Sequence, residues 1–372
     1  MIMNPTFTKL LFSLSCLFCV TYATAQNDLL LKDYRPVSIY HTPRTEVAKA
    51  AYPVIDMHSH DYAPTTEELA RWVATMDEVG VKKTVILTCS TGSRFDSIVE
   101  RYGKYPGRFL FYCGFDYSGF GKPGWVQKAI AELQRCYEKG ARGIGELGDK
   151  GEGELYSRPT PGVGIHIDNP ALKPLLQKCS ELKMPVIIHV AEDQWMYEVP
   201  DSTNDGLMNS AHWHVNMLKP GKLGHDQLLA SLENAVKENP NTLFVACHFA
   251  NSCANLAVLG GMFDKYPNLF ADIAARYAEV SPVPNYTAAF MTKYQDRLVY
   301  GTDMGDQAKM YRITFRILES ADEHFYEIDQ FGYHWPLYGL HLPDQVLKKL
   351  YNGNAEKIIN YQVSPAPGLQ SR

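Results

Sequence analysis

The stretch Val54-Ile55-Asp56-Met57-His58-Ser59-His60 decides the fold of this chain. It begins with apolar residues and then places a polar residue at every second position. Successive side chains of an extended strand point to opposite faces, so Asp56, His58 and His60 are predicted to share one face. Two imidazoles spaced in this way can bind one divalent cation, most commonly zinc. The pair alone is a weak signal, because a single His-x-His often arises by chance.

Three later segments strengthen the signal. Each is an apolar, strand-like run that ends in a residue able to bind a metal, and they cover residues 185–189, 243–248 and 298–303. A parallel barrel assembles its active site from residues at the carboxyl ends of its strands. The four segments together therefore predict a metal centre at one rim of such a barrel.

Strand-like and helix-like patterns alternate along most of the sequence. The predicted strands cover residues 54–60, 84–90, 108–117, 141–148, 186–191, 242–249, 268–274 and 297–303. Such alternation predicts parallel pairing, and eight strand–helix units predict a closed (β/α)8 TIM barrel in a single domain, with a long loop insertion at 192–224 after the fifth strand. An open doubly wound sheet is the alternative, and the missing glycine-rich turn after the first strand disfavours it. Residues 343–361 are expected to form short helices that close the barrel.

The N-terminal residues and the composition limit the functional classes to which the chain could belong. The first 25 residues are typical of a secretory signal peptide, with Lys9, a short apolar run at 10–20 and the cleavage signal Ala23-Thr24-Ala25. We therefore expect a signal peptide at 1–25, an N-terminal strap at 26–52 and the barrel at 53–372, in a secreted or periplasmic protein without a membrane span after cleavage. The net charge of −5 and the lack of a basic run give no indication of nucleic-acid binding. The six cysteines of the mature chain are dispersed, so we expect buried free thiols.

The candidate ligands all fall at one predicted rim. They are His58 and His60 on the first strand, Glu146 on the fourth, His189 on the fifth, His248 on the sixth and Asp303 on the eighth. Imidazoles and a carboxylate around a divalent cation lower the pKa of bound water to about 7. Asp303 is placed to accept a proton from that water. His248 is placed to polarise a substrate carbonyl or to bind a second metal.

This ordered set resembles the amidohydrolase superfamily. The motifs Asp56-Met57-His58-Ser59-His60, His189, His248 and Gly301-Thr302-Asp303 are most similar to its amidohydrolase-related family, which includes aminocarboxymuconate-semialdehyde decarboxylase. The resemblance implies that His58, His60, His189 and Asp303 are metal ligands, and that His248 is catalytic or belongs to a second metal site. Some members carry a bridging modified lysine on the fourth strand, where this chain has Glu146. That glutamate either bridges two metals or orients a ligand, and one or two ions, zinc first, are expected.

Three functions follow from these observations. The first is hydrolysis of an amide, lactone or ester bond in a small molecule by metal-activated water. The second is metal-dependent, non-oxidative decarboxylation, a carbon–carbon lyase reaction. The Ile144–Gly148 run also resembles the TatD deoxyribonucleases, but DNA binding needs basic contacts that this acidic chain lacks, so this is a minor alternative. A fourth possibility is an exported binding protein on a degenerate barrel.

Three residues are predicted to bind the substrate. Arg94 and Arg276 follow the second and seventh strands and could bind a carboxylate or phosphate, although a surface salt bridge is a somewhat better explanation for each. Trp195 lies in the aromatic-rich insertion, which could cover the barrel mouth. His212 and His214 in the same insertion form a second His-x-His that we consider a poor metal site. The sequence leaves the substrate, the number of metals and homo-oligomer formation open.

Overall fold

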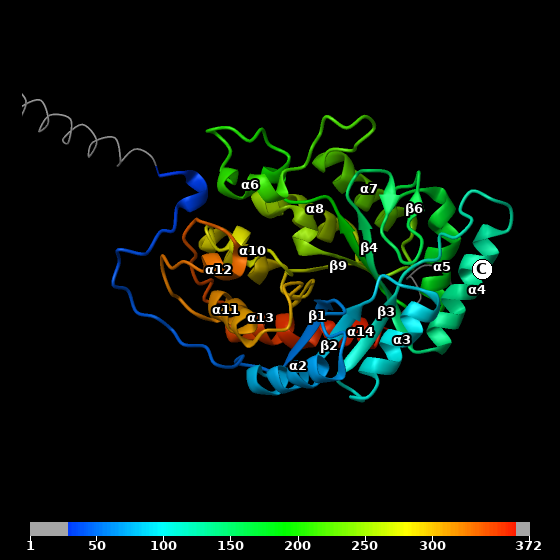
Figure 1. The fold of residues 1–372 in the computed structure, drawn as a ribbon, viewed down its shortest axis with the longest axis horizontal. Helices are drawn as coiled ribbons and strands as arrows, with labels where there is room; N and C mark the ends of the chain where they lie inside the picture. Colours follow the sequence, from blue (N-terminus) through cyan, green and yellow to red (C-terminus); the bar gives the residue numbers. More distant parts are fainter. Residues whose placement is uncertain (1–28, 362–372) are drawn as a thin grey trace, which may run out of the picture.

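A computed structural model describes residues 29–361, except for the side chains of Leu31 and of residues 210–212 (Figure 1). The predicted signal peptide therefore lies outside the described residues. Eight parallel strands pair in chain order: β1 (Val54–Ser59), β2 (Val81–Leu87), β3 (Phe109–Cys113), β4 (Ala141–Asp149), β7 (Val186–Val190), β8 (Phe244–Ala246), β9 (Leu269–Asp272) and β10 (Leu298–Val299). Each predicted strand is present.

The barrel closes between its first and last strands. Backbone N–H groups of Met57 and Thr302 donate to the carbonyls of Tyr300 and His58, at 2.9 and 3.1 Å. These bonds join β1 to the segment that continues β10. The TIM barrel is confirmed, and the open-sheet alternative is wrong.

The main helices surround the barrel. They are α2 (Thr66–Val79), α3 (Gly92–Tyr102), α4 (Trp125–Glu138), α5 (Lys173–Glu181), α7 (His225–Glu238), α8 (Leu256–Lys265), α10 (Pro284–Lys293) and α11 (Ala308–Glu319). Helix α2 shows why these segments are helical. Its N-cap Thr65 and Glu68 form a capping box, its buried face carries Leu69, Trp72 and Met76 at helical spacing, and left-handed Gly80 ends it. None of the described helices is long and apolar enough to cross a membrane.

Two layers of apolar side chains form the core. One fills the barrel interior and includes Ile55, Met57, Val85 and Val245, while a larger one lies between strands and helices. The C-terminal helices α13 (Asp344–Lys348) and α14 (Asn354–Ile359), joined by the π-helical turn η6 (Lys349–Gly353), close one end as predicted. Ala355 and Ile358 belong to the interior cluster. The opposite end of the barrel, which these helices do not cover, carries the candidate functional site.

The loops at that opposite end contain short helices and strands. After β4 the chain forms a hairpin of β5 (Glu154–Leu155) and β6 (Gly162–Val163), followed by η2 (Pro170–Leu172). The insertion after β7 contains η3 (Gln194–Met196) and α6 (Leu207–Trp213). It is tied to the β4 loop, because Leu223 N donates to Gly151 O at 2.9 Å and the amines of Lys219 and Lys222 contact Glu152 at 3.0 and 2.9 Å.

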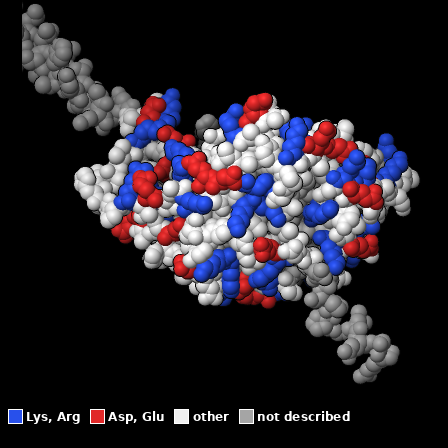
Figure 2. Space-filling view, turned by 90° about the horizontal axis from the view of Figure 1, so that it is seen from below, with Lys and Arg blue, Asp and Glu red and all other residues white. Residues whose placement is uncertain are grey.

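The segment before β1 runs along the outside of the barrel. It begins with the turn η1 (Leu31–Asp33) and passes beside the chain that follows α11, including α12 (Ile328–Phe331) (Figure 1). Thr45 donates to Asp322 through its backbone N and its hydroxyl, at 2.8 and 2.6 Å. On the face shown in Figure 2, acidic and basic side chains are interspersed rather than gathered by sign.

One detail of the first strand differs from the sequence prediction. The register of β1 on β2 shifts between Asp56 and Ser59, so strict alternation does not hold there. Asp56 is buried away from the candidate ligands and accepts hydrogen bonds from the backbone N and the hydroxyl of Thr302, at 3.1 and 2.7 Å. The expectation that Asp56 would share a face with His58 and His60 is therefore wrong.

Candidate metal centre

His58 lies at the centre of the rim cluster. Its side chain has no exposed surface, and its Nδ1 donates to Asp272 Oδ2 at 2.8 Å. This bond turns Nε2 toward Glu146 Oε1 and Asp303 Oδ2, each 3.8 Å away. Nε2 is buried without a hydrogen-bond partner among the described residues. A buried nitrogen acceptor costs free energy unless something binds it.

His60 and His248 are fixed in the same way. Nδ1 of His60 lies 2.9 Å from the carbonyl of Leu87, and Nδ1 of His248 lies 2.8 Å from the carbonyl of Ala274. A carbonyl only accepts, so each Nδ1 carries the hydrogen and each neutral ring leaves a lone pair on Nε2. Three imidazoles therefore direct Nε2 toward one space.

Two carboxylates complete this space. Asp303 Oδ1 lies 3.1 Å from His60 Nε2, and His248 Nε2 lies 3.6 Å from Glu146 Oε1 and 3.7 Å from Asp303 Oδ2. Burial opposes ionisation of Asp303 and Glu146, but the surrounding imidazoles outweigh it and hold both pKa values below the ordinary range. Lone pairs and negative charges that face one another at such distances are stabilised by a positive charge, which either a proton on an imidazole or a metal cation between them supplies.

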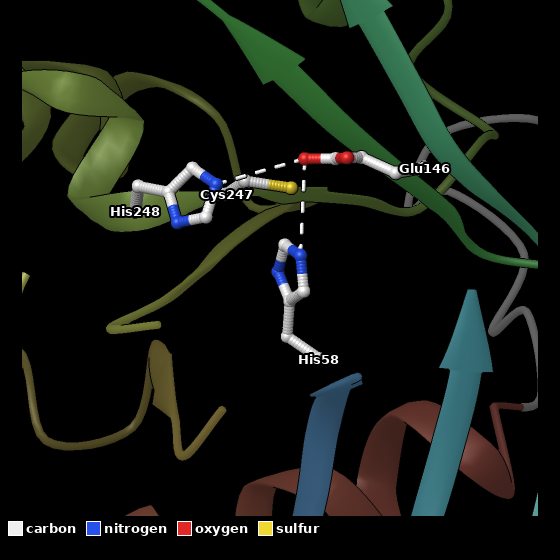
Figure 3. A group of neighbouring side chains, drawn as sticks. All are labelled: His58, Glu146, Cys247 and His248. Carbon is white, nitrogen blue, oxygen red and sulfur yellow. Dashed lines mark ion pairs between the residues drawn. The ribbon is translucent and has the colours of Figure 1, made fainter. Parts of the chain in front are cut away.

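The donor atoms fall into two overlapping groups that could hold a metal. One contains His58, Glu146, Cys247 and His248, and the other contains His58, His60 and Asp303, with all ligand atoms of a group within 4.8 Å of one another. Figure 3 shows the first group, in which the Glu146 carboxylate faces both imidazoles. Nitrogen and oxygen donors, an orphaned Nε2 and carbonyl or carboxylate partners on each Nδ1 fit a divalent cation. Because His58 belongs to both groups, the set suits one or two ions.

The loops that follow the strands position these side chains. After β8 the chain turns through η4 (His248–Asn251), whose four residues have φ between 52° and 60°, and Asp303 after β10 has φ of 53°. Non-glycine residues adopt this left-handed conformation at a cost of about 1–3 kcal/mol each. Asp272 at the end of β9 anchors the turn, since its Oδ1 accepts from the backbone N of His248 at 2.8 Å. Its second oxygen is the one that orients His58.

His189 is placed differently from the other histidines. Its Nδ1 lies 2.6 Å from Glu146 Oε1 and its Nε2 lies 2.9 Å from the carbonyl of Ala191. Burial lowers the basicity of this imidazole, but the carboxylates of Glu146 and Glu192 raise its pKa to about 9. Both nitrogens are thus engaged, and His189 contacts a candidate ligand rather than presenting a lone pair.

The sequence reasoning did not assign three residues at this centre. Asp272 orients His58, Cys247 offers a buried sulfur, and the hydroxyl of Tyr62 donates to Asp303 Oδ1 at 3.1 Å. Burial, reinforced by the nearby carboxylates, raises the pKa of the Cys247 thiol. Asp272 ends an apolar strand just as His189 and Asp303 do, so the same pattern could have identified it.

The cluster opens into a cavity of about 890 Å³. Its walls include Arg94, as predicted, and Trp213 and His214 from the insertion. Arg94 is exposed and has no hydrogen-bond or ion-pair partner among the described residues, which leaves its guanidinium available to a substrate anion. The insertion therefore reaches the barrel mouth, as expected for a covering loop.

The other two predicted substrate residues lie elsewhere. Trp195 lines a different cavity, because the chain turns away through η3 before it returns with Trp213. Arg276 is buried, donates to Asn251 Oδ1 and lies near the carboxylates of Glu192 and Asp193, at 3.5 and 3.2 Å. Neither is among the described residues that line the cavity of the metal centre.

Comparisons with known proteins agree with this architecture. A protein-family model described as Amidohydrolase matches residues 40–360. Among solved structures, an uncharacterised TIM-barrel protein from Bordetella bronchiseptica aligns with a TM-score of 0.51 and 13% identity, over 83% of this chain and 98% of that one. A 5-carboxyvanillate decarboxylase from Novosphingobium aromaticivorans, complexed with manganese and a nitrobenzoic acid, aligns with a TM-score of 0.50 and 15% identity, over 86% of this chain and 100% of that one. At these identities the structures support the fold alone. No curated protein matches the sequence.

Proposed function

The chain belongs to the amidohydrolase family, and from its rim cluster we propose a metal-dependent hydrolase that cleaves an amide, lactone or ester bond of a small molecule. The observation that carries the proposal is the convergence of two further imidazoles, of His60 and His248, and two carboxylates on the unpartnered Nε2 of His58. The residues proposed to hold the cation are His58, His60, His248, Glu146 and Asp303. Zinc is our first choice, and manganese is the second because the decarboxylase above is described with it.

A divalent cation in such a site lowers the pKa of bound water toward neutrality and polarises a substrate carbonyl. The chain supplies the proton transfers. Asp303 keeps a partly exposed carboxylate, with 23% of its side-chain surface accessible, and its low pKa keeps it ionised at neutral pH. It is proposed to accept the proton of the attacking water and to pass it to the leaving group.

Two neighbours are proposed to position these groups. Tyr62 donates to Asp303 Oδ1 and holds that carboxylate at the cavity edge. His189 contacts Glu146 at 2.6 Å and fixes its oxygens toward the imidazoles. The resemblance noted above would make His189 a direct ligand instead, and the metal content of a His189 variant separates the two roles. Loss of the metal on His189→Ala supports a ligand, whereas retention supports a positioning residue.

The substrate is proposed to be an anionic small molecule. Arg94 lines the cavity without an internal partner, and guanidinium groups bind carboxylates in bidentate fashion. The cavity of about 890 Å³ lies within the range of small-molecule sites.

Decarboxylation is the second candidate. The observation that favours it is the combination of Arg94 with the similarity to a manganese-containing 5-carboxyvanillate decarboxylase. The same cavity would then hold an aromatic acid, and its carboxylate would leave as carbon dioxide.

One experiment decides between the two reactions. Metal-loaded protein is incubated with amides, lactones, esters and aromatic acids in water enriched in oxygen-18, and Asp303→Asn is the control. Oxygen-18 incorporation into a new acid identifies the hydrolase. Carbon dioxide release that leaves the remaining product without the label identifies the lyase. If neither product forms in any metal-loaded sample, the proposal of an enzyme is wrong.

We also propose that the chain is exported, to the periplasm or the exterior, and that cleavage follows Ala25. The proposal rests on the sequence pattern at 1–25. Mass spectrometry of protein recovered from its natural compartment should give a chain beginning at Gln26. A cytoplasmic chain that retains Met1 would contradict export.

A further inference from the structure

A second cavity, of about 670 Å³, lies beside the one that contains the metal centre. It is lined by the start of the insertion, by η5 (Cys253–Asn255), by the end of α9 (Tyr277–Val280) and by the loop near Trp335. Arg276 lies between the two cavities. Its guanidinium contacts Glu192, which lines the first cavity, and Asp193 and Glu279, which line the second.

The walls of the second cavity are acidic. The described lining residues include the carboxylates of Asp193, Glu198, Asp201, Asp205 and Glu279, and no lysine or arginine is among them. Asp193 and Glu279 are the deepest of these, with only 2% and 4% of their side-chain surfaces exposed. Buried carboxylates of one sign repel each other and attract a cation.

Two buried acceptor oxygens, on residues that line this cavity, have no hydrogen-bond partner among the described residues. They are Asp193 Oδ2 and Glu279 Oε2. Arg276 Nε lies 3.2 Å from Asp193 Oδ2, but its hydrogen is donated to Asn251 Oδ1 at 2.9 Å, so this contact is ionic only. The other Glu279 oxygen accepts from the hydroxyl of Tyr333 at 2.6 Å. A buried acceptor left open is unfavourable, and either a proton on the carboxyl group or a donor from a ligand removes that cost.

The local charges are also unbalanced. Glu192 is matched by Lys150, with which it forms an ion pair, and it also faces His189. Arg276 is the cation that contacts both Asp193 and Glu279, and His225 also attracts Asp193. Burial raises the pKa of both carboxyl groups, that of Glu279 to about 7, although Arg276 opposes this rise. When both carboxyl groups are ionised they carry two negative charges against the single charge of Arg276, and a bound cation would stabilise that ionised pair.

Aromatic side chains surround these acids. Trp195, Tyr286 and Trp335 line the cavity, and Tyr286 is 46% exposed at its edge. Tyr333 stacks on Trp335 with ring centroids 4.5 Å apart and also approaches Trp195. Aromatic faces attract ammonium groups and provide an apolar wall for the rest of a ligand.

We propose that this cavity binds an organic monocation, namely a primary ammonium with an aromatic or apolar body. Its N–H groups would donate to the carboxylates of Asp193 and Glu279, and its body would contact the aromatic walls. A metal ion fits less well, since the carboxylates of this cavity do not form a group of three closely spaced ligand atoms among the described residues. The proposal does not depend on the reaction at the metal centre.

Calorimetric titration of the purified protein with benzylamine tests the proposal, and neutral benzyl alcohol serves as the isostere. Benzylamine is expected to bind one site, and benzyl alcohol about tenfold more weakly or worse, because the alcohol lacks the charge. Glu279→Gln keeps the acceptor for Tyr333 but removes the charge, so it should weaken benzylamine binding by about 10- to 100-fold. Glu67→Gln, an exposed glutamate in α2, is the matched control and should bind as the wild type does.

Tyr286→Leu keeps the test decisive if Glu279→Gln does not fold. The exposed Tyr286 ring makes no hydrogen bond to the described residues, and its loss should weaken benzylamine binding about two- to fivefold. Unchanged affinity in both folded variants, equal affinity for benzyl alcohol, or no binding at millimolar concentration would overturn the proposal. Displacement of benzylamine by magnesium chloride, but not by sodium chloride of equal ionic strength, would show a metal site instead. Metal-stripped protein should give the same affinities, so failure at the metal centre cannot be mistaken for failure here.

Discussion

Replacement of Asp272 by asparagine should weaken metal binding without removing any proposed ligand. Asp272 Oδ2 accepts the Nδ1 hydrogen of His58 at 2.8 Å, and both side chains are fully buried. In Asp272→Asn the amide oxygen can still accept from the backbone N of His248, which places the amide NH2 against the N–H of His58. Two donors then face each other. The imidazole relieves this conflict by moving its hydrogen to Nε2, the atom that should bind the cation.

The magnitude follows from this geometry. Loss of a partner that orients a metal-binding histidine costs about 10- to 100-fold in metal affinity, or about 1.4–2.7 kcal/mol. We expect the upper end, because no water reaches either group to compensate. The substitution also removes a negative charge that attracts His58. This attraction is shown by the pKa of Asp272, which His58 holds below the ordinary value in spite of burial.

Competition with a chromophoric zinc chelator measures this change. Asp226→Asn is the matched control, because the Asp226 carboxylate is fully exposed on α7. Thermal melts of the metal-free proteins show whether Asp272→Asn remains folded. A folded Asp272→Asn protein that binds zinc within twofold of the wild type would refute the reasoning.

Four further changes test other parts of the structure. Asp303→Asn should retain most of the metal while kcat falls by about 10²–10⁴, because the amide cannot accept a proton. A variant with bound metal and the kcat of the wild type would contradict this. His248→Ala should keep one ion and lower kcat by about 10²–10³ if it polarises the substrate, whereas loss of one equivalent identifies it as a ligand. Gly301→Ala should destabilise the fold by about 1–3 kcal/mol in urea, since its Cβ would lie 2.7 Å from the Cβ of His58. The pKa of Glu279 is raised in the folded state, which therefore binds the proton more tightly than the unfolded state does. The unfolding free energy should fall as the pH rises from about 5 to about 8, and Glu279→Gln should make this fall smaller.

The sequence predicted the barrel because its strands are apolar runs at regular spacing. Parallel strands bring their carboxyl ends to one rim, so residues such as His58, His248 and Asp303 could be placed together without coordinates. The C-terminal helices were predictable for the same reason, since Ala355 and Ile358 belong to an amphipathic pattern that needs a core.

The directions of several side chains and the paths of the loops could not be predicted from the sequence. The register shift in β1 turns Asp56 toward Thr302, and no periodicity signals such a shift in advance. His189 ends a strand like the other histidines, but its orientation depends on a contact with Glu146, from another strand, and on the carbonyl of Ala191 in the turn that follows. Arg276 follows a strand end yet is buried by the acids of the insertion, a pairing that only the folded loop creates.

The most direct test of the metal centre is the metal content of purified wild-type protein beside His58→Ala, after dialysis against zinc and then against metal-free buffer. His58 belongs to both candidate ligand groups, so its removal should empty the site whether it holds one ion or two. We predict at least one tightly bound equivalent in the wild type and almost none in a folded His58→Ala protein. Less than about a tenth of an equivalent in the wild type, with zinc or manganese in turn, would contradict the account, because a preformed set of oriented imidazoles and carboxylates should bind the ion that it fits.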